Sequence, residues 1–444
     1  MGYVFGGTEA RRFPIATLSV VLANVVVYLL TSSENLLTAT ASRYVYRYGF
    51  IPALLLSYEG LARIFTSMFI HADLFHIFFN MYFLYIFGRG VEDILGSVRF
   101  LTLYFLSGIG AALFHTASTP VVGLESIAIP AVGASGAISG ILGAYMMFFP
   151  RTSLVACFPI LFFPVCYTLR ASAYLALWFA TQVVYGYMKI GGVAFFAHAG
   201  GFIAGIALAW VLGSGKVREL KVVRSFMGVF RYIVFQVYNE GLGFFTKAVL
   251  VFLMTLTAAT LGYYASSLGA PTVMVYQGYL RVDGVDDIVL LKVSANGSYS
   301  LSESQYTDVN IVLTRLSKVG FLVNQNYSGR TIDTTQKPLQ GTVTLRISLA
   351  GYLEIAETVP VAVYARASYD GAGVLVRAEG TMVTQVVIVR AYRVDKSPAT
   401  YTFSYNAIGP YETEPVRVAA IPSVAIALVS TYVTTKKDKE LSVA

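Results

Sequence analysis

The eight residues GASGAISG, at positions 133–140, pose the choice on which the interpretation of this chain depends. They contain two serines four positions apart, and each serine is followed by a glycine. In one interpretation a serine of this stretch is a nucleophile. In the other, small residues spaced by four simply let two membrane helices approach closely, which is a common device for helix contact. The composition, the placement of charges and the other motifs of the chain help to choose between these two interpretations.

The composition is that of a membrane protein. Of the 444 residues, 56% are hydrophobic and only 13% are charged, whereas a soluble domain has roughly 25% charged residues. A helix needs about 20 apolar residues to cross the hydrocarbon core of a bilayer. The sequence predicts eight spans of this kind, at 14–31, 74–88, 100–116, 135–149, 171–188, 194–212, 248–266 and 417–433.

The basic residues are clustered beside these spans. Arg11 and Arg12 precede the first span, five basic residues lie at 216–231 after the sixth, and three lysines lie at 436–439 after the eighth. By the positive-inside rule all three clusters face the cytoplasm. The sequence therefore predicts a multi-pass plasma-membrane protein with both termini in the cytoplasm. Since the net charge of +8 comes from residues beside apolar spans, the expected partner is the lipid bilayer and not a nucleic acid.

The character of the chain changes after the seventh span. Runs of β-branched residues with period-two alternation, such as TVTLRISL at 342–349, are separated by turn signals and predict short strands. Strands of this kind are typical of a β-sandwich. The predicted segments are a six-helix domain (1–215), a basic cytoplasmic connector (216–247), a seventh helix (248–266), an extracytoplasmic β-rich domain (267–415), and an eighth helix with a basic cytoplasmic tail (416–444).

Polar residues within the predicted spans gather at one depth. His76 and Asn80 are four residues apart and share a helix face, Ser135 opens the fourth span, and His198 lies in the first turn of the sixth. Because successive spans cross in alternating directions, these groups all lie near the external ends of their helices. Polar and ionisable groups inside a membrane are functional candidates.

The chemistry that fits these groups is nucleophilic acyl transfer. A neutral imidazole within hydrogen-bond reach activates a serine hydroxyl, here Ser135 and His198. The amide of Asn80, the ring of His76 and the backbone N–H of Ser135 are potential donors to an oxyanion. No acidic residue is placed to orient the ring of His198, so the sequence predicts a Ser–His dyad whose histidine is held by packing.

Neither a metal nor another cofactor is expected. His71 precedes His76 by five positions, which points it about 140° away on a helix and predicts a place in the preceding loop. No HExxH motif is present, and the spacing of these histidines is not that of a metalloprotease. Cys157 and Cys166 are too few for a disulfide framework and are interpreted as inert packing thiols.

Each motif also has a purely structural interpretation. Gly136 and Gly140 form a small-xxx-small pair, and Gly201 and Gly205 would let the sixth helix approach the fourth. A single histidine such as His198 is often a satisfied structural group. A transporter or channel is a further alternative, although that class typically shows inverted repeats and interrupted helices at the midplane, which this sequence does not show.

Taken together and in order, three motifs resemble the rhomboid family of intramembrane serine proteases. They are HADLFHIFFNMYF at 71–83, GASGAISG at 133–140 and AHAGGFIAG at 197–205, and the resemblance covers about residues 10–212. It implies a six-helix bundle that cleaves transmembrane or juxtamembrane segments of membrane proteins near the external face. A proteolytically inactive rhomboid-like protein that binds membrane clients is the alternative. The oligomeric state is not predicted.

The resemblance also assigns roles to residues. It implies that Ser135 is the nucleophile and His198 the general base, and that His76 and Asn80 serve the oxyanion. Ser139 stands where the family usually has an aromatic ring stacked on the catalytic histidine, and Ala62-Arg63 stands in place of Trp-Arg in the first loop. His71, Gly133, Gly201 and Gly205 match supporting positions of the family, and Glu92 and Gly96 match a structural motif. Gly136 and Ser139 are the other expected supporting residues.

Overall fold

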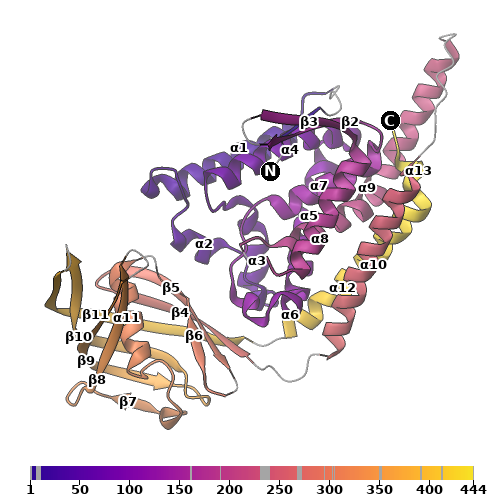
Figure 1. The fold of residues 1–444 in the computed structure, drawn as a ribbon. Helices are drawn as coiled ribbons and strands as arrows, with labels where there is room; N and C mark the ends of the chain where they lie inside the picture. Colours follow the sequence, from indigo (N-terminus) through magenta and orange to yellow (C-terminus); the bar gives the residue numbers. More distant parts are fainter. Residues whose placement is uncertain are drawn as a thin grey trace. The chain divides into compact units, whose positions relative to one another are not determined.

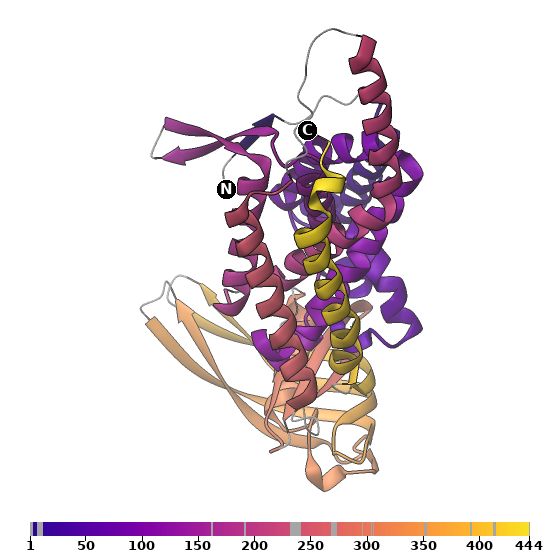
Figure 2. The same cartoon turned by 90° about the vertical axis from the view of Figure 1, so that its right-hand side faces the viewer.

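The computed structural model divides into two compact units. One comprises Met1–Ala270 together with Thr413–Ala444, and the other comprises Pro271–Glu412. Figures 1 and 2 show the fold from two directions. The structure describes residues 3–6, 12–160, 163–190, 192–230, 241–267, 273–294, 296–302, 304, 306–349, 353–390, 393–411 and 414–443.

The first unit is a helical bundle, which confirms the polytopic membrane fold expected from the sequence. Within the described residues, six helices are long and apolar enough to cross a membrane. Two of the six, α10 and α12, lie side by side in both views. The six are α1 (Ile15–Ser32), α4 (Leu74–Leu95), α5 (Ser97–Ala117), α9 (Phe195–Phe230), α10 (Phe244–Ser267) and α12 (Glu414–Tyr432).

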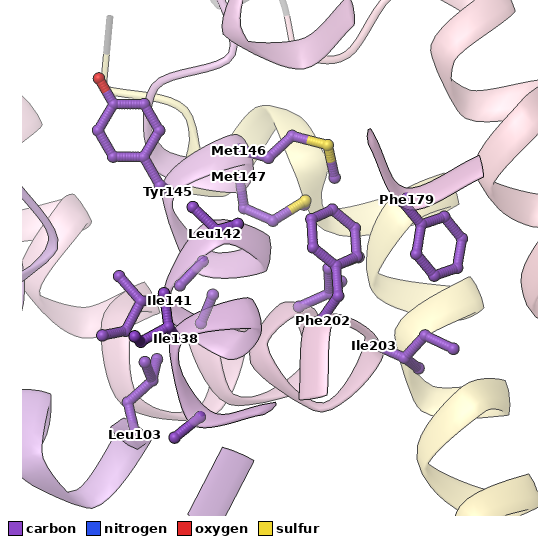
Figure 3. Packing of buried hydrophobic residues seen from close by; sticks show 14 of the residues in the cluster. Leu103, Ile138, Ile141, Leu142, Tyr145, Met146, Met147, Phe179, Phe202 and Ile203 are labelled. Atoms are coloured by element: carbon purple, nitrogen blue, oxygen red, sulfur yellow. The ribbon is translucent and has the colours of Figure 1, made fainter. Parts of the chain in front are cut away.

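The fourth and fifth expected spans are shorter helices. Helix α7 (Ser135–Phe148) has 14 residues and α8 (Ala171–Tyr187) has 17. At 1.5 Å per residue α7 measures about 21 Å, which is less than the roughly 30 Å of hydrocarbon. It can be this short because α4, α5, α8 and α9 pack around it. All its residues from 137 to 148 are buried, and Figure 3 shows the apolar side chains that surround it.

A carboxylate from α4 holds the start of α1. The first N–H groups of a helix have no partner within the helix and attract negative charge. Both oxygens of Glu92 accept such hydrogen bonds, from the backbone nitrogens of Ala16 at 2.9 Å and Thr17 at 2.8 Å. Helix α4 then ends at Gly96, whose positive φ of 76° turns the chain into α5. The Glu92–Gly96 motif is therefore structural.

Short elements complete the bundle. Cys166 on β3 is disulfide-bonded and lies opposite Cys157 in the β2–β3 ladder, so the expectation of inert thiols is wrong. Antiparallel pairing brings the N-terminal strand β1 onto β2, which the sequence did not indicate. The short elements are β1 (Tyr3–Gly6), α2 (Ser42–Tyr48), α3 (Tyr58–Thr66), α6 (Thr119–Val122), β2 (Ser153–Ile160), β3 (Phe163–Arg170) and α13 (Asp438–Leu441), with short 3₁₀ or π turns at 33–35, 52–54, 67–69, 124–128 and 433–437.

Most of the described residues of the connector expected at 216–247 belong to the helices on either side of it. Helix α9 continues to Phe230, and α10 already begins at Phe244. Residues 216–224 read KVRELKVVR, a run rich in good helix formers and free of glycine and proline, so the helix propagates beyond its apolar part. Residues 231–240, the centre of the expected connector, lie outside the described residues.

The second unit is β-rich, as expected, but its strands form one curled antiparallel sheet and not two facing sheets. The sheet order is β6-β5-β4-β11-β10-β9-β7, and β8 also pairs with β9. Helix α11 (Thr307–Lys318) packs Val309, Val312 and Leu316 into the core of this unit. The strands are β4 (Val273–Val282), β5 (Val285–Ser294), β6 (Tyr299–Leu301), β7 (Thr331–Asp333), β8 (Leu339–Leu349), β9 (Leu353–Tyr369), β10 (Leu375–Arg390) and β11 (Arg393–Tyr411).

Glycines allow α7 and α9 to approach each other backbone to backbone. A Cβ atom on Gly201 would lie 2.0 Å from the carbonyl oxygen of Gly136, and one on Gly205 would lie 2.0 Å from that of Gly140. Neither carbonyl belongs to a flexible side chain that could move aside. Any larger residue at 201 or 205 would therefore push the two helices apart.

We expect Gly201→Ala to destabilise the bundle by about 1–3 kcal/mol, since overpacking a tight core costs this much. Gly215→Ala, on the same helix, is the matched control because a Cβ there meets nothing within 4 Å. In that position alanine should stabilise the helix by roughly 0.5–1 kcal/mol. Denaturant unfolding in detergent measures both. Equal effects of the two substitutions would contradict the close-approach argument.

Candidate active site

Ser135 and His198 are in direct contact. Nε2 of His198 lies 2.7 Å from Oγ of Ser135, although the two residues are 63 positions apart in the sequence. Ser135 is the first residue of α7, and His198 lies in the first turn of α9. Both side chains are partly buried. The glycine contacts between α7 and α9 place the start of each helix at the same level, which brings these side chains together.

The second nitrogen of the His198 ring is held by a residue that sequence reasoning missed. Nδ1 of His198 lies 2.9 Å from Oε1 of Gln182 on α8. An amide oxygen can only accept, so Nδ1 carries the proton and Nε2 is left bare toward Ser135. Gln182 itself is buried. The sequence contained one indication of this role, because Gln182 is a polar residue inside the fifth apolar segment and a polar residue there needs a partner.

An aromatic ring also lies against His198. The indole of Trp178, one turn before Gln182 on α8, stacks on the imidazole with centroids 6.4 Å apart and planes at 29°. Ser139, at the position where a ring was expected, instead donates to the backbone oxygen of Ser135 at 2.6 Å. The aromatic contact is therefore supplied from α8 and not from α7. The hydrogen bond to Gln182 and the contact with Trp178 together orient the His198 ring. The expectation that packing alone holds this ring is therefore incomplete.

The ring of His76 and the hydroxyl of Ser135 both lie beside Gly133. Its Nδ1 accepts from the backbone N–H of Ala72 at 3.3 Å, which leaves the proton on Nε2. Gly133 has a φ of 115°, and a Cβ atom on it would lie 2.6 Å from Nε2 of His76 and 3.6 Å from Oγ of Ser135. Glycine has no side chain to fill this space. The space is therefore bordered by Nε2–H of His76 and by the hydroxyl of Ser135.

Asn80 lies one turn below His76 on the same face of α4. Its amide nitrogen donates to the backbone oxygen of His76 at 2.7 Å. The amide group is buried, and its oxygen has no partner among the described residues. Asn80 therefore supports the His76 turn, and one of its two N–H bonds remains available.

The loop before Ser135 is held from three sides. His71, in the loop before α4, is fully buried, and its Nε2 accepts from the backbone N–H of Ala134 at 3.4 Å. The N–H of Gly133 donates to the oxygen of Ser67 at 2.9 Å. Ala131 and Phe50 exchange both of their backbone hydrogen bonds, at 2.8 and 2.9 Å. The segment before α4 thus positions the loop that leads into Ser135.

The other expected supporting residues serve packing. Gly136 faces α5, where a Cβ atom would lie 2.6 Å from Cβ of Ala111. Arg63 of the first loop is buried and donates to the backbone oxygen of Tyr46 at 2.8 Å. Among the described residues no group of three or more His, Cys, Asp or Glu side chains is arranged to hold a metal ion.

Comparison with known proteins identifies the bundle. The rhomboid domain family matches residues 58–215. Rhomboid protein 1, mitochondrial, of Saccharomyces cerevisiae is 30% identical over 157 residues, covering 34% of this chain and 42% of that protein. Rhomboid protease AarA of Providencia stuartii is 32% identical over 172 residues, covering 34% of this chain and 57% of that protein.

The similar proteins include a relative described as inactive, and the residues matched by the family model lie within the helical unit. Inactive RHOMBOID-like protein 8 of Arabidopsis thaliana is 36% identical over 84 residues, which is 19% of this chain and 22% of that protein. The chain spans less than two thirds of the length of each of these three relatives.

Gln182→Leu should make Ser135 react about tenfold or more slowly with a fluorophosphonate probe. Leucine is of similar size but accepts no hydrogen bond, so the imidazole loses the partner that fixes its tautomer, and tautomer fixing contributes strongly to serine activation. Gln182→Glu retains an acceptor at the same distance and should keep more of the reactivity. Labelling rates in detergent measure both variants. Slow labelling in the glutamate variant and normal labelling in the leucine variant would contradict this role.

Proposed function

Because residues 58–215 are a rhomboid domain, we propose that this multi-pass membrane protein is an intramembrane serine endopeptidase whose catalytic dyad is Ser135 and His198. The observation that carries the proposal is the 2.7 Å contact between Nε2 of His198 and Oγ of Ser135. No cofactor is required for the reaction. The substrates would be transmembrane or juxtamembrane segments of other membrane proteins.

The dyad would act by nucleophilic catalysis. Oγ of Ser135 attacks the carbonyl carbon of the scissile peptide bond while its proton passes to Nε2 of His198. The protonated imidazole then gives this proton to the leaving amine, which leaves an acyl-enzyme on Ser135. A water deprotonated by the same imidazole then attacks the acyl carbon, and the imidazolium returns the proton to Oγ of Ser135 as the acid leaves. Gln182 would keep the proton on Nδ1 throughout, so that Nε2 alone exchanges protons with substrate.

Donors around Gly133 would stabilise the oxyanion. The carbonyl oxygen of the substrate would enter the space that the absent side chain of Gly133 leaves beside Oγ of Ser135. Nε2–H of His76 borders this space. The second N–H of Asn80 and the backbone N–H of Ser135 would be the further donors. Removing one such donor typically costs about 10²–10³ in kcat.

The short length of α7 suits this reaction. Its N-terminus, with Ser135, would lie below the external membrane surface, since the helix is about 21 Å long. A substrate helix whose backbone hydrogen bonds are broken near its external end could then present a peptide bond to the serine.

Ser135→Ala and His198→Ala should each reduce cleavage of a transmembrane substrate in liposomes to background. Ser139→Ala is the matched control, because Ser139 only donates to a carbonyl of its own helix and its loss should leave most of the activity. Equal loss from Ser135→Ala and Ser139→Ala would contradict the assignment of the nucleophile. An intact wild-type protein that cleaves no membrane substrate and leaves the probe unreacted would favour the inactive, client-binding alternative.

We further propose that the end of the bundle opposite Ser135 faces the cytoplasm of a plasma membrane. The C-terminal residues of the chain pack against this end of the bundle. Asp438 forms a 2.8 Å ion pair with Lys247 and accepts from the N–H of Leu242, and the N–H of Val443 donates to Phe148 at the end of α7. The basic clusters at 216–224 and 436–439 flank this end, as the positive-inside rule requires of a cytoplasmic side.

An epitope tag after residue 443 should be cleaved by protease only in inside-out vesicles. A tag inserted at the exposed turn around Asn296 should be cleaved only in intact spheroplasts, because the β-rich unit would lie outside. The reverse pattern for either tag would overturn this orientation.

A further inference from the structure

A small cavity lies at the end of the bundle opposite Ser135. Its volume is about 190 Å³, smaller than the roughly 300–1,000 Å³ of pockets that take drug-sized ligands. Segments far apart in the sequence form its wall: the turn after α7, the start of α8, the turn before α10, and α13. The lining residues are Pro150, Arg151, Arg170, Ser172, Gly241, Leu242, Gly243 and Lys439.

The lining is cationic. Three of the eight lining residues carry a positive charge (Arg151, Arg170 and Lys439), and none is acidic. The adjacent carboxylate, Asp438, is already engaged by Lys247 and by the N–H of Leu242. Such a set of charges is suited to an anion, and guanidinium groups in particular match the geometry of phosphate oxygens.

Two further features point to a phosphate-sized group. Ser172 is a largely buried residue that lines the cavity, and no hydrogen bond of its hydroxyl is found among the described residues. Gly243 leaves one wall open, since a Cβ atom there would meet nothing within 4 Å. A hydroxyl donor and open backbone beside three cations are features of phosphate-binding sites.

Exposed aromatic residues place the cavity at the level of lipid headgroups. Phe244 and Phe245, which directly follow the lining residue Gly243, are 79% and 82% exposed on a helix long enough to span a membrane. Large apolar side chains this exposed need lipid around them. The cavity, lined by the preceding Gly243, would then lie where the hydrocarbon ends. Basic pockets between helices on the cytoplasmic side are sites where anionic headgroups bind.

We propose that this cavity binds the phosphate group of an anionic phospholipid from the adjoining leaflet. Arg151 and Arg170 belong to the rhomboid domain, whereas Lys439 belongs to the C-terminal segment. A phosphate held by all three side chains would join this segment to the end of α7 and the start of α8. The lipid would thus stabilise the docking of the last two membrane helices on the bundle.

The test uses the full chain in nanodiscs of phosphatidylcholine with and without phosphatidylglycerol. The double variant Arg170→Gln/Lys439→Gln removes two cations of the cavity. Arg218→Gln/Lys436→Gln removes two exposed cations at the same end that do not line it. Native mass spectrometry counts retained phosphatidylglycerol, and the thermal midpoint in pure phosphatidylcholine shows whether each variant is folded.

We expect the cavity variant to bind phosphatidylglycerol at least about tenfold more weakly than wild type, since each basic residue near an anionic surface contributes about 1 kcal/mol. The control variant should retain binding within about twofold. If inorganic phosphate alone raises the thermal midpoint of wild type but not of the cavity variant, and phosphatidylglycerol is not retained, the site takes free phosphate and the lipid assignment is wrong. If both variants lose phosphatidylglycerol binding equally, or if neither variant loses it, the cavity is not the binding site.

Discussion

The contact between the backbones of α7 and α9 is the constraint on which the site depends. The carbonyl oxygens of Gly136 and Gly140 occupy the space that side chains at Gly201 and Gly205 would need. The helices are therefore close enough for a histidine in the first turn of α9 to reach the first residue of α7. Small residues and a reactive serine are often treated as alternative explanations of a motif such as GASGAISG. In this fold the close approach that the small residues allow is what brings His198 to Ser135.

Both ring nitrogens of His198 and Nδ1 of His76 have defined partners in the site. An unsatisfied polar atom in an apolar interior costs about 1–3 kcal/mol, so the imidazole nitrogens are held by specific neighbours. Gln182 takes one nitrogen of His198 and leaves the other for Ser135, while the N–H of Ala72 directs the His76 proton toward Gly133. These partners favour opposite tautomers for the two rings, with the proton on Nδ1 of His198 and on Nε2 of His76. No carboxylate is needed for either.

The C-terminal helices form part of the bundle and are not a loose appendage. Ser430 on α12 donates to the backbone oxygen of Ile203 on α9 at 2.6 Å, and the hydroxyls of Tyr187 on α8 and Thr260 on α10 lie 2.9 Å apart. An ion pair between Asp438, at the start of α13, and Lys247, in the first turn of α10, joins these two C-terminal helices. The helices that present His198 and Gln182 are therefore braced by segments outside the matched rhomboid domain, which ends at residue 215.

The sequence by itself determined the membrane class, the eight helical segments, the β-rich unit and the residues of the Ser135–His198 pair, because hydropathy, periodicity and short motifs are local properties. It also showed that His71 would leave the helix that carries His76. Only the tertiary structure decided that Gln182 and Trp178 orient His198, that α7 is a short buried helix, that α9 runs past residue 215, and that the strands join into one sheet. Each of these depends on which segments become neighbours, and a hydrogen-bond partner on another helix or a strand partner far along the chain leaves no periodic signal in the sequence around it.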